Sequence, residues 1–152
     1  MNKIRYCLGF AFSYDLGNVL LIVKNRPIWQ AGLLNGIGGK AEDGETTHDA
    51  MVRECEEETG LTIDTWNPFA QIKGDGFVID CFKTKSHLIF EAESLTDEQV
   101  NTYPVDYNLL FDEGTPELAA LVAFAVKPTD GAMSFYGVVQ RGKKAQHART
   151  NW

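Results

Sequence analysis

Long hydrophobic runs are absent from this sequence of 152 residues. No apolar stretch approaches the roughly 20 residues that a membrane-spanning helix needs. The first six residues, Met-Asn-Lys-Ile-Arg-Tyr, lead into a strand-like pattern and not into a signal peptide. We therefore expect no membrane partner and a cytoplasmic location.

Basic residues are also few. Lys and Arg number 14 against 21 Asp and Glu, so the formal net charge is −7. Proteins that bind duplex nucleic acid neutralise its phosphates with a basic surface, so this balance argues against such a partner. It is compatible with a small phosphorylated ligand that arrives with its own metal ion.

Cysteine and histidine are scarce, and neither forms a metal-binding pattern. An odd number of cysteines without CxxC or zinc-type spacing predicts free thiols in a reducing compartment, and not a disulfide framework; these are Cys7, Cys55 and Cys81. Structural or surface roles are the simpler interpretation of the histidines, which are His48, His87 and His147.

The composition suits one small domain. Hydrophobic residues make up 44% of the chain, which is enough to fill a single core at this length. The sequence contains no repeat, low-complexity tract or linker. We predict a single domain over residues 1–140, followed by a basic, polar tail at 141–152; the oligomeric state is left open.

The most informative stretch is acidic. If residues 47–59 form a helix, Glu54, Glu57 and Glu58 stand at i, i+3 and i+4, so their carboxylates share one face. Like charges at this spacing destabilise an isolated helix. A hard divalent cation bound by oxygen ligands is the simplest reason to keep them together.

The spacing around these acids resembles the Nudix box, G-x5-E-x7-R-E-U-x-E-E-x-G-U, in which U is aliphatic. Nine constrained positions fall within the 23 residues that begin at Gly39 and end at Leu61. The single soft departure is Cys55 at an aliphatic position, and a buried cysteine behaves as a small hydrophobe.

This resemblance implies a fold and an activity. The fold is the Nudix α/β/α sandwich, with a mixed β-sheet between helices. The activity is metal-dependent hydrolysis of a phosphoanhydride, with Mg²⁺ or Mn²⁺ as cofactor. The implied metal ligands are the three box glutamates and the carbonyl of Gly39; the implied general base is either a box glutamate or a distant acid, for which Glu98 lies at a suitable place in the chain.

Two basic residues accompany the box. A forked guanidinium fixes carboxylate geometry well, so we expect Arg53 to hold Glu54 and Glu45 in position and not to touch substrate. Lys40, which follows the glycine cluster, is a candidate contact to a phosphate oxygen.

Elsewhere the patterns predict strands and one further helix. Thr46 or Thr47 and Gly60 are natural ends for the box helix. Residues 115–126 read as a helix introduced by Thr-Pro-Glu, with a buried strand as the alternative. Predicted extended segments are 3–13, 18–24, 62–65, 69–73, 76–82, 86–92, 100–103 and 132–139.

The segment 34–40, Leu-Asn-Gly-Ile-Gly-Gly-Lys, is similar to that of the Nudix subgroup that cleaves oxidised purine nucleoside triphosphates. This similarity implies that Asn35 hydrogen-bonds the base, and that Asp112 and Glu113 lie where that subgroup has two acids facing the base. Trp29 is either a wall for the base or an anchor of its loop.

We therefore predict a MutT-like pyrophosphohydrolase that acts on a small nucleotide, either a (deoxy)nucleoside triphosphate or its oxidised form, and releases a monophosphate and pyrophosphate. The alternatives are a pyrophosphatase for ADP-ribose or another nucleoside-diphosphate sugar, and a domain that senses a nucleotide without hydrolysing it. Cleavage of an RNA 5′ end is disfavoured by the acidic composition.

Overall fold

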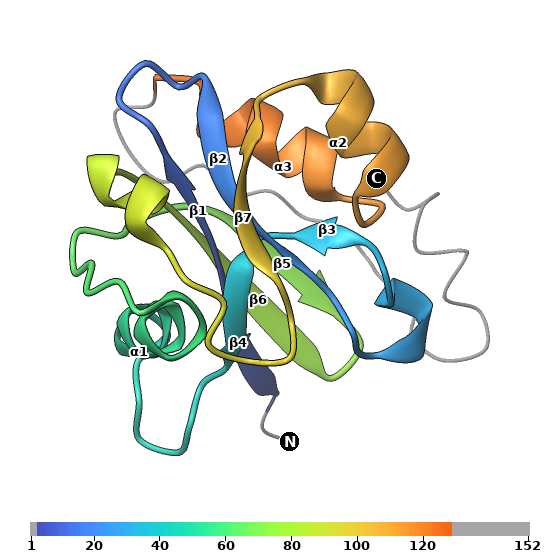
Figure 1. Cartoon of the computed structure of the whole chain (residues 1–152). Helices are drawn as coiled ribbons and strands as arrows, with labels where there is room; N and C mark the ends of the chain where they lie inside the picture. The colour runs from blue at the N-terminus through green and yellow to red at the C-terminus, as the bar shows by residue number, and fades with distance from the viewer. Residues whose placement is uncertain (1–2, 129–152) are drawn as a thin grey trace.

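The computed structural model describes residues 3–128, and a mixed seven-stranded sheet is its centre (Figure 1). The two central strands, β1 (Ile4–Phe12) and β6 (Phe77–Lys85), run parallel and pair from Ile4↔Phe77 to Phe12↔Lys85. The strand order along the main path is β3-β2-β1-β6-β5. The remaining strands are β2 (Asn18–Val23), β3 (Leu34–Asn35), β4 (Ile37–Lys40), β5 (Asn67–Gly74) and β7 (Val100–Pro104).

Helices cover both faces of this sheet (Figure 1). Helix α1 (Thr47–Thr59) lies on one face, and α2 (Tyr107–Glu113) and α3 (Leu118–Ala125) lie on the other. Two short 3₁₀ helices, η1 (Ile28–Gln30) and η2 (His87–Glu91), interrupt the connections. The predicted α/β/α sandwich is therefore confirmed.

Alternation along the strands supplies one core for each face. Phe10 and Phe12 of β1 join Leu118 and Leu121 of α3 in one buried cluster. Cys7 and Ala11, at odd-numbered positions of the same strand, join Met51 of α1 in the other. This division fixes α1 against the strands that carry the glycine segment.

Several predicted elements differ in the structure. Residues 62–65 form no strand. Their backbone is irregular, and the Ile63 side chain is buried in the core on the α1 side of the sheet. Residues 86–92 contain η2 instead of a strand, with the Ser86 side chain accepting from the Leu88 amide. The glycine segment, for which no strand was predicted, forms β4, and α2 was not predicted either.

The second predicted helix exists as α3, so the alternative of a buried strand is wrong. It begins at Leu118, with Glu117 and not Thr115 at its N-cap. The predicted strand 132–139, the boundary at residue 140 and the tail 141–152 lie outside the described residues. No helix among residues 3–128 is both long and apolar enough to cross a membrane.

Candidate active site

Helix α1 carries the box glutamates, and both its ends are formed by local chemistry. Thr46 accepts a hydrogen bond from the Asp49 amide at 3.0 Å at the N-cap. Gly60 ends the helix at φ 76°, a left-handed conformation that favours glycine. Because Met51 and Cys55 are buried against the sheet, the rotation of the helix is fixed, and with it the direction of each glutamate.

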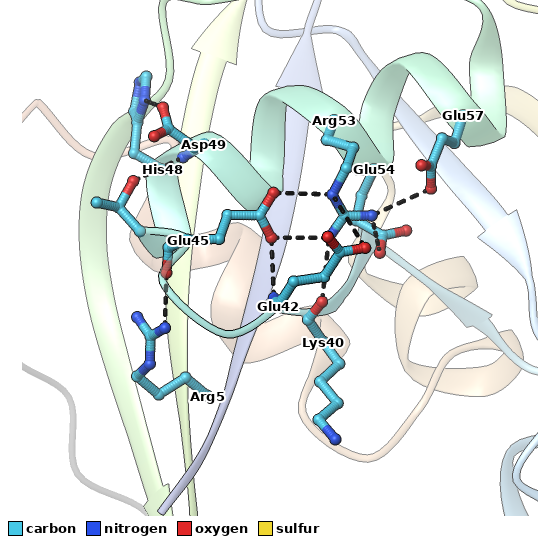
Figure 2. A network of polar contacts seen from close by, with 10 residues as sticks. Arg5, Lys40, Glu42, Glu45, His48, Asp49, Arg53, Glu54 and Glu57 are labelled. Carbon is cyan, nitrogen blue, oxygen red and sulfur yellow. Dashed lines mark hydrogen bonds and ion pairs between the residues drawn. The ribbon is translucent and has the colours of Figure 1, made fainter.

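Arg53 is the centre of a polar network on this helix (Figure 2). Its Nε and Nη2 donate to the two carboxylate oxygens of Glu45 at 2.8 and 2.9 Å. Its Nη1 donates to Glu54 at 3.0 Å and to Glu57 at 3.2 Å, and Nη2 also reaches the Lys40 carbonyl at 3.2 Å. Hydrogen bonds from Arg53 lower the pKa of Glu45 to about 2, so Glu45 stays ionised. Arg53 thus ties the loop before α1 to the helix.

Glu54 and Glu58 form an acidic pair one helical turn apart, in which Glu58 is buried and Glu54 partly buried. Glu58 is only 7% exposed, and burial, followed by repulsion from Glu54, raises its pKa. Burial also raises the pKa of Glu54, against the opposing effect of its bonds to Arg53. Both shifts mean that the pair resists carrying two negative charges by itself.

Gly39 lies directly against this pair. A Cβ atom at Gly39 would stand 2.5 Å from Oε1 of Glu54, so only glycine allows the carboxylate to approach this strand. Gly39 pairs with Cys7 across β4 and β1, which places its backbone beside the buried acids. The sheet therefore brings the predicted carbonyl ligand and Glu54 together.

In their present positions these side chains supply only part of the ligand set that a hard cation needs. Within residues 3–128, no three His, Cys, Asp or Glu side chains converge closely enough to hold a metal ion. The reason is Glu57, whose half-exposed side chain faces Arg53 (Figure 2). Glu54 and Glu58 supply suitable oxygen donors, and burial raises the pKa of both carboxyls, a shift that a nearby positive charge would oppose.

Glu98 is brought to the same place from a distant loop. It is 7% exposed, accepts from the Asn25 amide at 2.5 Å, and pairs with Lys24 at 3.4 Å. The loop that carries it lies against the end of α1, because the Leu95 amide donates to the Glu58 carbonyl at 3.3 Å, and the charge of Glu98 contributes to raising the pKa of Glu58.

A cleft of about 440 Å³ begins at this acidic end and extends across the sheet. Gly39 and Lys24 line the end near the acids, and Trp29, Gln30 and Asn35 line the other. There the cleft continues into a recess of about 60 Å³ with mostly apolar walls. The recess is lined by Leu8, Trp29, Gln30, Asn35, Ile72, Phe77, Ile79, Glu117 and Leu121.

The acid at this recess differs from the predicted pair. Asp112 and Glu113 are exposed near the end of α2 and line neither the cleft nor the recess. The acid that lines the recess is Glu117, which follows Pro116. An isolated bridge between Leu34 and Gly114 brings the two segments together. The Thr-Pro-Glu sequence was visible as a helix start, but the pairing that places Glu117 beside Asn35 is not local.

Lys40 lies away from the cleft. Its side chain is exposed and points away from Arg53 and its acids (Figure 2). It lines a separate hollow with Glu42, Asp43 and Glu54. Lys24 and Gln30 line the cleft but were not singled out from the sequence, because nothing in their local pattern marks them.

Comparison with known proteins points to one family. A family model described as the NUDIX domain matches residues 10–120. A protein of Danio rerio named oxidized purine nucleoside triphosphate hydrolase is 49% identical over 57 residues, which are 38% of this chain and 36% of that protein. The Mus musculus protein of the same name is 46% identical over 54 residues, 36% of this chain and 34% of that protein. The chain thus spans about a third of the length of these relatives.

Solved structures agree on the fold. The MutT protein of Bacillus halodurans is similar with a TM-score of 0.67 at 20% identity, over 90% of each chain. A MutT chain from a study of Aliivibrio salmonicida and Vibrio cholerae has a TM-score of 0.62 at 22% identity, over 81% of this chain and 98% of that one. At these identities the likeness concerns the fold alone.

Proposed function

The chain belongs to the NUDIX family; from that premise we propose that it is a Nudix hydrolase, a metal-dependent nucleoside triphosphate pyrophosphohydrolase with an oxidised or unmodified purine nucleotide as substrate. The observation that carries the proposal is the cleft itself. It joins Gly39, beside the buried acids, to Asn35 and Glu117 at the far recess. A nucleotide with its phosphates at the first end presents its base to the second.

Glu54, Glu58 and the Gly39 carbonyl are the groups that would hold Mg²⁺ or Mn²⁺, joined by Glu57 once it leaves Arg53. Such an ion neutralises phosphate oxygens and lowers the pKa of a bound water. The proposal is supported by the environment of Glu54 and Glu58, because burial raises both pKa values and a bound divalent cation would favour the ionised form of each carboxyl.

We assign Glu98 as the candidate general base, with a box glutamate as the alternative. A general base must be held within hydrogen-bond reach of the attacking water. Glu98 is suited to this because the Asn25 amide and Lys24 fix its carboxylate beside Glu58. In this role it would take the proton from the water that attacks phosphorus.

Asn35 has a fixed orientation that favours one kind of base. Its Oδ1 accepts from the Gly36 amide at 2.8 Å, so its Nδ2 group is the part left to donate to a ligand. An Asn35 donor therefore suits a ring carbonyl, and a Glu117 carboxylate suits ring N–H groups. A 6-oxopurine presents both, which agrees with the names of the partial relatives. Trp29 supplies an aromatic side wall.

A reducing, cytoplasmic setting is part of the proposal. All three cysteines are free and buried. Burial raises the pKa of Cys7 to about 12 and that of Cys55 to about 11, and it also raises the pKa of Cys81. Thiols held protonated in this way serve as packing groups.

The test is pyrophosphate release from a nucleotide panel with Mg²⁺, using the wild type, Glu57→Gln, Glu117→Gln and, as matched control, Asp112→Asn. The panel holds unmodified and oxidised dNTPs, ADP-ribose, NADH and a dinucleoside polyphosphate. We expect turnover of purine dNTPs that is lost in Glu57→Gln, changes its base preference in Glu117→Gln, and is unchanged in Asp112→Asn. Turnover of ADP-ribose alone would overturn the substrate assignment, and no turnover of any nucleotide would overturn the proposed activity.

A further inference from the structure

We propose that Gln30 is a specificity-determining residue that hydrogen-bonds the base of the bound nucleotide. The inference rests on the proposed function, because it takes the substrate to be a nucleotide whose base enters the recess. It adds a contact from the loop that follows β2, a part of the chain outside the box and outside the Asn35 segment.

The backbone amide and carbonyl of Gln30 both form hydrogen bonds within the loop. Its amide donates to the Pro27 carbonyl at 2.8 Å, and its carbonyl accepts from the Leu33 amide at 2.9 Å. The loop is closed at its base by bonds between Lys24 and residues 32 and 33. The shape of the loop therefore does not depend on the Gln30 side chain.

The Gln30 side chain has no hydrogen-bond partner among residues 3–128, although the residue is half-buried. A half-buried carboxamide has lost much of its contact with water, and here no hydrogen bond to another of residues 3–128 replaces it. Gln30 lines both the main cleft and the recess behind it. A ligand in the cleft is the group that can supply the missing partner.

The surroundings indicate which part of the ligand this is. Leu8 of β1 and Ile79 of β6 line the same junction and offer an apolar floor for a flat ring. Trp29, the neighbour of Gln30 in η1, forms the side wall. The phosphate end is at Gly39. A carboxamide at the junction therefore meets the edge of the base.

Gln30 also has a chemical capacity that its neighbours lack. The Gly36 amide already occupies one lone pair of the Asn35 oxygen, so Asn35 offers mainly its Nδ2 donor, and an ionised Glu117 can only accept. Gln30 can do both, so it suits a base edge on which an acceptor and a donor lie side by side. Because losing one such contact leaves polar groups unpaired, we expect a change in binding of about 5–20-fold.

The experiment compares Gln30→Met, which keeps the length of the side chain but no polar group, with Gln30→Glu, which keeps an acceptor and loses the donors. The control is Ile28→Ala in the same 3₁₀ helix, because Ile28 is 91% exposed and lines neither cavity. Binding of dGMP and of deoxyribose 5-phosphate is measured by calorimetry, KM and kcat are measured with purine dNTPs, and thermal unfolding reports folding.

We expect Gln30→Met to weaken dGMP binding and raise KM by about 5–20-fold, with kcat, deoxyribose 5-phosphate binding and thermal unfolding within about twofold or 2 °C of wild type. Gln30→Glu should in addition change the ratio of dGMP to dAMP affinity. Equal dGMP binding by wild type and Gln30→Met, or an equal loss for both ligands, would overturn the inference.

Failure of the proposed function has a different result. If wild type binds dGMP more tightly than Gln30→Met does but hydrolyses no nucleoside triphosphate, the Gln30 contact is supported and the proposed activity is wrong. If wild type hydrolyses purine dNTPs and Gln30→Met has the same KM, the proposed activity is supported and the Gln30 contact is wrong.

Discussion

Replacing Glu58 by Gln should make the metal-free protein more stable while abolishing its activity. Glu58 is 7% exposed and lies beside Glu54, and burial together with this neighbour raises its pKa. Gln has the same shape, carries no charge and can donate to the Glu54 carboxylate. The substitution removes one of two negative charges that the fold holds out of water.

The expected gain follows from the raised pKa. Each tenfold change in a protonation constant corresponds to about 1.4 kcal/mol, so the raised pKa of Glu58 makes its ionised side chain cost at least about 1.4 kcal/mol. For a chain of this size 1 kcal/mol is about 2–4 °C in Tm. We therefore expect Glu58→Gln to unfold at least about 3 °C higher than wild type near pH 8 in EDTA.

The pH dependence has a definite sign. Because folded Glu58 binds its proton more tightly than the unfolded chain does, wild-type stability falls as the pH rises above about 4.3, the pKa of a free glutamate. The gap between variant and wild type should thus be small near pH 4 and grow towards pH 8. Added Mg²⁺ should raise the Tm of wild type and leave that of Glu58→Gln nearly unchanged.

Thermal unfolding by circular dichroism at four pH values, with EDTA and with Mg²⁺, measures this. Glu56→Gln is the matched control, since Glu56 is exposed on the same helix. A Glu58→Gln protein that is less stable than wild type at pH 8 in EDTA, or an equal gap at every pH, would refute the argument from buried charge.

Three further predictions concern the same site. Gly39→Ala should lower kcat at least about tenfold with little change in Tm, because its Cβ displaces the Glu54 carboxylate; Gly38→Ala should instead lower the Tm, because its Cβ would meet the Cys7 carbonyl oxygen, a fixed backbone atom. Equal Tm values for the two variants would contradict this contrast. Arg53→Lys should lower kcat about 10–100-fold, because an ammonium cannot reproduce the fork that holds two glutamates; unchanged kinetics would show that the network is dispensable. Glu98→Gln should lower kcat about a hundredfold or more with KM nearly unchanged if this residue is the general base, and a kcat within threefold of wild type would move that role to a box glutamate.

Local sequence determined helix α1. The spacing of Glu54, Glu57 and Glu58, the threonine before the helix and Gly60 after it act within a few residues of one another, so their effect can be read from the chain. The mixed sheet between helices followed from the same patterns together with the family resemblance. The family itself could be inferred from nine positions of the box.

The tertiary structure decided what these residues meet. Glu57 turns to Arg53, and Glu117 and not Asp112 reaches the recess. Gln30 lines the cleft, and its side chain has no hydrogen-bond partner in the part of the chain that the structure describes. Each of these outcomes depends on segments far apart in sequence, such as the bridge between Leu34 and Gly114 and the close approach of β4 to α1. Short segments such as residues 37–40 and 87–91 likewise take the structure that their neighbours allow, because so few residues have too weak a preference of their own.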